Sequence, residues 1–350
     1  MNSGTETAVR PDQGRRQPAE RRIGGRMAAL IAVAAVLVFI CGLSLAVGSA
    51  ALPLSTVWAA LTDRDQSIDH ITVMDVRLPR TLLGLLVGAA LGVAGALMQA
   101  VGRNPLADPG ILGVNAGAGL AVAVGVAYLG LTTISEFVWL GMVGAVVAAV
   151  LVAAIAARGP GGATPLRLTL VGVALTAVLN GLSLSLSLVN PSRFERMRFW
   201  GVGSITDRPP GTVEFVAPFI VAGLVIALAA SRSLNVLALG DDVARSVGAR
   251  LGLTRAAAVV SLVLLCGAAT AAAGPIAFVG LMVPHAVRML VGTDQRWVIA
   301  FSALAGPVLV LAADLFGRVV VRPEELEVGI VTPLFGAPVL IWLVRRTRRL

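Results

Sequence analysis

Apolar and polar positions follow one another along this chain in long blocks. Stretches of about 20 apolar residues recur over almost the whole length, separated by short polar segments. A helix of ~20 apolar residues can cross the ~30 Å hydrocarbon core of a bilayer. The pattern therefore predicts an all-α polytopic membrane protein with ten transmembrane helices within a membrane domain at 27–345. Their expected ranges are 27–47, 80–101, 110–127, 136–157, 167–189, 212–231, 254–272, 277–291, 298–316 and 329–344.

Composition strengthens this prediction and leaves little room for a soluble domain. Of the 350 residues, 57% are hydrophobic and only 13% are charged, and the mean hydropathy is +0.88. Soluble globular domains are far less apolar than this. The chain is therefore expected to reside in the cell (inner or cytoplasmic) membrane as a multi-pass protein.

The charges indicate which side of the membrane each connection occupies. Residues 1–26 form a polar, arginine-rich tail, predicted to be disordered, and the last residues contain Arg345, Arg346, Arg348 and Arg349. Basic residues collect on the cytoplasmic side of membrane proteins, so both termini are predicted to be cytoplasmic. With that topology the inner segments hold 19 arginines and 7 acids, whereas the outer segments hold 9 and 11. The net charge of +9 thus reflects membrane orientation and gives no reason to expect nucleic acid binding.

The chain contains no lysine, because all 28 basic residues are arginine. A phosphate-binding loop of the form GxxxxGK[ST] requires a lysine, which excludes an ATP site of that kind. If ATP drives the protein, ATP and Mg are bound by a partner ATPase subunit, and no cofactor is expected on this chain. Two histidines and two cysteines are too few for a metal centre, and Cys41 and Cys266 are interpreted as packing residues.

The segment at about 234–252, which we call the insert, lies between the sixth and seventh expected spans and is polar and helix-forming. Val243, Val247 and Leu251 recur every fourth residue, which predicts one apolar face on a short helix. Asp241 and Asp242 stand at its start, where the helix dipole favours negative charge. Such a cytoplasmic helix either docks against another protein or lies on the lipid surface; the spacing leaves both open.

Polar residues near the outer side suggest a second site. Arg77 and Arg80 flank Leu78-Pro79 at the start of the second span, either as interfacial anchors or as guanidinium groups for the carboxylates of a docking partner. Asp314 is an acid within the ninth span, so it should face protein or water. It lies four residues before Arg318, which predicts an ion pair.

Three isolated polar residues in or near spans, Gln99, Asn115 and Asn180, are candidates either for interhelical hydrogen bonds or for a transport pathway. The segment 274–288 contains Gly274-Pro275 and Pro284, and is expected to interrupt a span twice, as cavity-lining helices of transporters do. Asp108 is expected to cap the third span. No arrangement of nucleophile, base or paired acids suggests a catalytic residue.

Several motifs in this order resemble one known family. They are Arg-Leu-Pro-Arg at 77–80, Gly-Val-Ala-Gly-Ala-Leu-Met-Gln at 92–99, Asn-Pro-Leu-Ala-Asp-Pro-Gly at 104–110, Trp-Gly-Val-Gly-Ser at 200–204, the insert, Phe-Val-Gly-Leu-Met-Val-Pro-His at 278–285 and Gly-Ala-Pro at 336–338. The chain is similar over residues 77–345 to the permease subunit of the iron-siderophore and cobalamin ABC importers, the FecCD-type or type II importer family. The departures are confined to turns: Glu325-Leu326-Glu327-Val328 lacks the usual proline, and Asp294-Gln295-Arg296 replaces the common Asp-His-Arg.

The resemblance implies a permease that pairs with a second permease subunit, identical or paralogous, in the lipid bilayer. Two cytoplasmic ATPase subunits would dock on coupling helices formed by Leu239, Gly240, Asp241, Asp242, Val243, Ala244, Arg245, Val247 and Gly248. An extracytoplasmic binding protein would deliver the substrate and dock on Arg77, Arg80 and Arg318, so reversing the charge of Arg77 and Arg80 should abolish uptake while the complex still assembles. Ferric siderophore is the expected substrate, with cobalamin or haem as alternatives. From another class, an ion-coupled secondary transporter would have to use Asp314, almost the only carboxylate within the spans.

Overall fold

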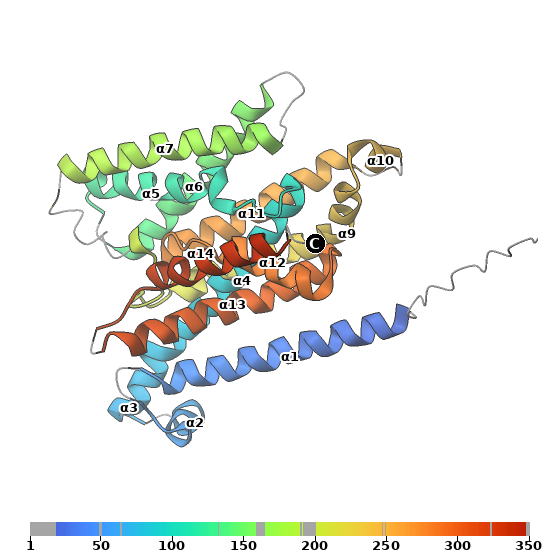
Figure 1. Ribbon diagram of the computed structural model, residues 1–350. Helices are drawn as coiled ribbons and strands as arrows, with labels where there is room; N and C mark the ends of the chain where they lie inside the picture. Colours follow the sequence, from blue (N-terminus) through green and yellow to red (C-terminus); the bar gives the residue numbers. More distant parts are fainter. Residues whose placement is uncertain are drawn as a thin grey trace, which may run out of the picture.

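The computed structural model describes residues 19–347, apart from 49–50, 64, 132, 159–164, 190, 192–200, 247, 249 and 323. Every regular element in this part of the chain is a helix (Figure 1). One helix corresponds to each of the ten expected spans, which confirms the all-helical fold. Their bounds are α1 Ala19–Ala46, α4 Leu78–Gly102, α5 Val114–Val124, α6 Ile134–Ala157, α7 Pro165–Val189, α9 Thr212–Ala238, α11 Leu251–Ala273, α12 Val279–Val291, α13 Gln295–Val320 and α14 Val328–Thr347.

Within the described part of the chain, seven helical stretches are both long and apolar enough to cross a membrane. The other three apolar helices, Val114–Leu129, Val279–Val291 and Val328–Trp342, are shorter. A helix of 13 residues, such as α12, rises only ~20 Å, whereas the hydrocarbon core is ~30 Å thick. The structure therefore supports the ten-helix arrangement, while ten complete membrane crossings remain a prediction.

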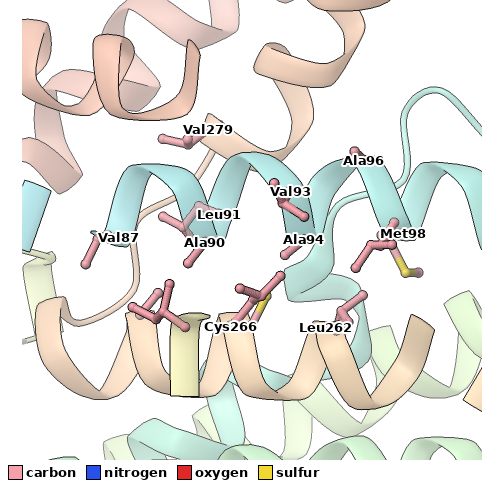
Figure 2. Close-up of a cluster of buried hydrophobic side chains, with 14 of the residues drawn as sticks. Val87, Ala90, Leu91, Val93, Ala94, Ala96, Met98, Leu262, Cys266 and Val279 are labelled. Carbon is pink, nitrogen blue, oxygen red and sulfur yellow. The ribbon is translucent and has the colours of Figure 1, made fainter. Parts of the chain in front are cut away.

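The central helix of the bundle is α4, the most deeply buried of the seven long candidates. It packs against α9, α11, α12 and α13. Figure 2 shows one of these contacts, in which small and branched residues of α4 such as Ala90 and Ala94 face Leu262 and Cys266 of α11. Small side chains let two helices approach closely in a lipid environment. Cys266 is buried in this contact, as expected of a packing residue, whereas Cys41 of α1 is only partly buried.

Two apolar helices, α1 and α7, lie at opposite edges of the bundle (Figure 1). Few residues of either helix are fully buried by the rest of the chain. Apolar surfaces this large are covered in a working protein, and lipid or another subunit would cover them here.

The two ends of the bundle differ in structure. One end, called here the α10 end, holds the start of α1, the end of α14 and the short helix α10, Asp241–Ser246 (Figure 1). The opposite end, called the α2 end, holds two short helices, α2 (Leu54–Thr62) and α3 (Ile68–Ile71). A π-helical turn, Thr72–Arg77, joins α3 to the start of α4.

Two local predictions are wrong. The segment 274–288 is interrupted once and not twice, because α12 runs without a break through Pro284. The expected apolar face through Val243, Val247 and Leu251 does not form either. Gly248 adopts a left-handed φ of 74°, which ends helical geometry, and Leu251 begins α11 instead. Val247 lies outside the described residues. Asp108 does act as a cap, because its carboxylate accepts a hydrogen bond from Gly110 N at 2.7 Å. It caps the 3-10 turn Pro109–Leu112 just before α5, whereas the N-cap of α5 itself is Gly113.

Candidate functional site

The insert at the α10 end is a sharp, well-anchored turn. Gly240, with φ 108°, separates the end of α9 from α10, and Asp241 opens α10. Arg255 of α11 donates a hydrogen bond from Nη2 to Asp241 Oδ2 at 2.7 Å, and Arg103, directly after α4, donates one to Asp241 Oδ1. One carboxylate thus joins α10 to both α4 and α11. We call Asp241, Arg103 and Arg255 the Asp241 cluster.

The two arginines also set the electrostatics of this turn. The hydrogen bond from Arg255 and, after it, the contact with Arg103 hold the pKa of Asp241 below the usual range of an aspartate. A depressed folded-state pKa means that the stabilising contribution is present at neutral pH, above the unfolded pKa. It is lost as the pH falls through the folded-state pKa.

Most of the remaining α10 surface points away from the bundle. Leu239, Val243 and Arg245 are exposed, and the Asp242 side chain is 99% exposed, whereas Ala244 is buried. Among the described residues, Asp242 forms an ion pair with Arg245 of the same helix alone, at 3.2 Å. The insert therefore presents a face of mixed apolar and charged residues to its surroundings, while the opposite side of α10 is attached to the bundle through Asp241.

The end of α9 has a second anchor. Asn235 donates from Nδ2 to Asp294 Oδ1 at 2.7 Å, and its Oδ1 accepts from the backbone N–H of Gln295, also at 2.7 Å. Asp294 caps the start of α13 by accepting from Arg296 N. The insert is thus fixed to α13 as well as to α4 and α11.

The α2 end contains a buried charge network centred on Asp314 of α13, which is only 1% exposed. Arg80 of α4 donates to Asp314 Oδ1 from Nη2 at 2.7 Å and from Nε at 3.1 Å. Arg318 donates to Oδ2, which confirms the predicted i,i+4 pair. Arg80 also contacts Glu325 at 2.7 Å. Both Asp314 oxygens are therefore occupied by guanidinium groups.

Arginines at this end also bind the end of α1. Arg77 donates to the carbonyl oxygens of Leu45 and Ala46, both at 2.8 Å. Arg318 donates to those of Ser44 at 2.8 Å and Val47 at 3.0 Å. The last carbonyls of a helix have no intrahelical partner and carry partial negative charge, so cations stabilise them. These arginines hold α1, a helix with little other burial, against the bundle.

This geometry changes the interpretation of the three expected docking residues. Arg77, Arg80 and Arg318 are each at most 8% exposed, and their guanidinium groups are engaged inside the chain. A docking protein would reach them only if this end of the bundle rearranged. Their docking role stays a prediction, and the contacts support a positioning role. The expectation that charge reversal at Arg77 and Arg80 spares assembly conflicts with this burial.

The candidate pathway residues divide into two groups. Gln99 donates to the carbonyls of Gly280 at 3.4 Å and Leu281 at 3.1 Å, and accepts from Arg288, so its amide joins α4 to α12. Asn115 accepts from Thr270 at 2.8 Å, joining α5 to α11. These contacts favour interhelical hydrogen bonding. Asn180 is exposed on α7 and remains a pathway candidate.

An apolar helical bundle with charged anchors at both ends defines a polytopic membrane protein. The family model of the FecCD transport family matches residues 36–346, and the chain belongs to this family. It is 49% identical to the ferric enterobactin transport system permease protein FepD of Escherichia coli, over 90% of this chain and 94% of that one. It is 40% identical to the probable siderophore transport system permease protein YfiZ of Bacillus subtilis, over 84% and 88% of the two chains.

A solved structure agrees with this assignment. A metal-chelate type ABC transporter, described in an inward-facing conformation, superimposes with a TM-score of 0.80 at 25% identity. The match covers 91% of this chain and 99% of that one. Helix arrangement and sequence motifs thus point to the same class of transport protein.

Proposed function

We propose that this chain is the transmembrane permease subunit of an ATP-driven importer for a ferric siderophore. The observation that carries the proposal is the near full-length, 49% identical match to a ferric enterobactin permease. Membership of the FecCD transport family over residues 36–346 supports the same mechanism.

The α10 end suits the cytoplasmic side in this proposal. It holds the start of α1, which contains Arg26, the end of α14, which contains Arg345, and the insert, in keeping with the positive-inside rule. The exposed face formed by Leu239, Asp242, Val243 and Arg245 would receive a partner ATPase, which would bind ATP and Mg. The α2 end would face the substrate-binding protein.

The apolar face of α7 supports a membrane partner. This helix is predominantly apolar, and few of its residues are fully buried within the chain. Pairing with a second permease subunit, identical or paralogous, would cover part of it, and lipid would cover the rest. Substrate would pass along the interface between the two subunits.

The occupancy of Asp314 argues against an ion-coupled secondary transporter. Coupling would need a carboxylate that releases and takes up a proton or cation within the spans. Both Asp314 oxygens are bound by arginines, and the residue is 1% exposed. Such a carboxylate is engaged in structural ion pairs and is not open to a transported ion.

Uptake by reconstituted vesicles tests the function. We expect vesicles that contain the permease, its cognate ATPase and a binding protein loaded with radiolabelled ferric siderophore to accumulate iron with ATP. They should not do so with a non-hydrolysable analogue. Transport of labelled haem or cobalamin instead would retain the mechanism and replace the substrate. Accumulation driven by an ion gradient without ATP would overturn the mechanism.

A further inference from the structure

The Asp241 cluster distinguishes Asp241 from its neighbour in sequence. Asp241 is 30% exposed and binds Arg103 and Arg255, which belong to two different parts of the bundle. Asp242, with the same charge, is 99% exposed, and its ion pair is with Arg245 inside α10. A role of Asp241 that depends on its contacts can therefore be separated experimentally from the negative charge of α10.

Arg103 is held in an unusual backbone conformation at this point. It ends α4 with φ 47°, in the left-handed region that residues other than glycine seldom adopt. Its backbone N–H bonds to carbonyls of the last turn of α4, and its side chain reaches Asp241. The end of α4 is thus fixed in direction by contact with the insert.

The helix α4 offers a direct mechanical connection across the bundle. Its 25 residues span ~37 Å. Arg80, in the network around Asp314, lies in its first turn, and Arg103 directly follows its last residue at the α10 end. One turn before Arg103, Gln99 bonds to Arg288 and to carbonyls of α12. A displacement of α10 would therefore reach α4 and α12 through polar contacts rather than through loosely packed loops.

We propose that Asp241 is a positioning residue that couples the ATPase-facing insert to α4 and α11. Its carboxylate, held by Arg103 and Arg255, transmits the movement of α10 to the helices that open and close the pathway. The inference rests on the proposed function, because it assigns a consequence to ATPase docking at this insert. It predicts that a substitution that breaks the cluster leaves the docking face in place and ATP hydrolysis active, but lowers the amount of iron taken up per ATP hydrolysed.

The test compares Asp241→Asn with Asp242→Asn in the full complex with ATPase and loaded binding protein. Three quantities are measured: co-purified ATPase subunit, ATP hydrolysis and iron taken up per ATP hydrolysed. For Asp241→Asn we expect the ATPase to remain bound and uptake per ATP to fall about tenfold, a typical size for coupling between sites. Asp242→Asn alters the docking face itself, so we expect it to lower the amount of co-purified ATPase, with hydrolysis and uptake falling together and the uptake per ATP unchanged. Equal ratios in the two variants would overturn the inference.

A second variant guards against loss of assembly in Asp241→Asn. Arg103→Gln removes one donor and leaves the contact between Asp241 and Arg255 in place, and it too should lower uptake per ATP. Asp241→Glu, which keeps the carboxylate, should restore part of the ratio. A purely structural defect would lower hydrolysis and uptake together and leave their ratio unchanged, which would contradict the proposal. Absence of ATP-driven uptake in the wild-type complex would instead contradict the proposed function.

Discussion

Replacing Asp314 by asparagine is expected to destabilise the protein by about 3–5 kcal/mol, the cost of removing one partner from a buried ion pair. The substitution keeps the shape of the side chain but removes its charge. Two largely buried guanidinium groups, those of Arg80 and Arg318, then lose their shared carboxylate. Glu325 still contacts Arg80, but it is partly exposed and leaves Arg318 uncompensated.

Thermal unfolding of the detergent-purified permease measures this effect. The midpoint of Asp314→Asn should lie below that of the wild type by on the order of 10 °C. Asp242→Asn is the matched control, since it makes the same chemical change at a fully exposed side chain and should leave the midpoint unchanged. If the two variants unfold at the same temperature, the network around Asp314 does not stabilise the fold.

The same network limits what charge reversal at Arg77 and Arg80 can reveal. A glutamate at position 80 would place a third carboxylate beside Asp314 and Glu325 in a buried site. A glutamate at position 77 would face the carbonyl oxygens of Leu45 and Ala46. Loss of uptake in such a variant would reflect loss of the fold before it reported on docking.

The sequence predicted the helices well because each one coincides with an apolar block, and most of these blocks are long. Helix boundaries agree to within a few residues at most ends, and larger differences occur where polar residues continue a helix beyond its apolar part. Helix α9, for example, runs to Ala238, beyond the expected end at 231. Local polar contacts were also accessible: the spacing of Asp314 and Arg318 predicted their pair, and Asp108 was identified as a cap.

Contacts between distant segments could not be predicted from the sequence. Arg80 and Asp314 are 234 positions apart, and no local pattern brings them together. Every residue has a backbone carbonyl, so the residue types at the end of α1 do not indicate that its carbonyls accept hydrogen bonds from Arg77, and this role was missed. An acid within a span was a signal that a partner existed, but the sequence offered only the partner four residues away.

Periodicity failed in the insert because it ignores the backbone. Val243 and Leu251 have the spacing of one helical face, yet Gly248 between them takes a left-handed φ. A single glycine of this kind outweighs the hydrophobic pattern, because it changes the direction of the chain. The arginines of the Asp241 cluster were also missed, although the sequence held a usable signal. Arg103 and Arg255 both lie in or beside expected inner connections, and the connection next to Arg255 contains Asp241.

Replacing Gly95 by alanine is expected to be among the most damaging single changes in the bundle. A Cβ atom at this position would lie 1.8 Å from the carbonyl oxygen of Gly280 and 2.5 Å from its Cα. Both are backbone atoms, so α4 and α12 would have to separate. Overpacking of this kind costs about 1–3 kcal/mol or more. Separation would also break the hydrogen bonds from Gln99 to the carbonyls of Gly280 and Leu281.

Gly119→Ala provides the control for Gly95→Ala, because Gly119 lies inside α5 and a Cβ there meets nothing within 4 Å. Alanine in an open helical position stabilises by about 0.5–1 kcal/mol, so this variant should unfold at or above the wild-type temperature. Gly95→Ala should unfold well below it and yield less monodisperse protein on size-exclusion chromatography. Equal midpoints for the two variants would show that α4 and α12 can separate freely. The close contact would then contribute nothing to stability, and the polar connection through Gln99 would be too soft to carry movement from α4 to α12.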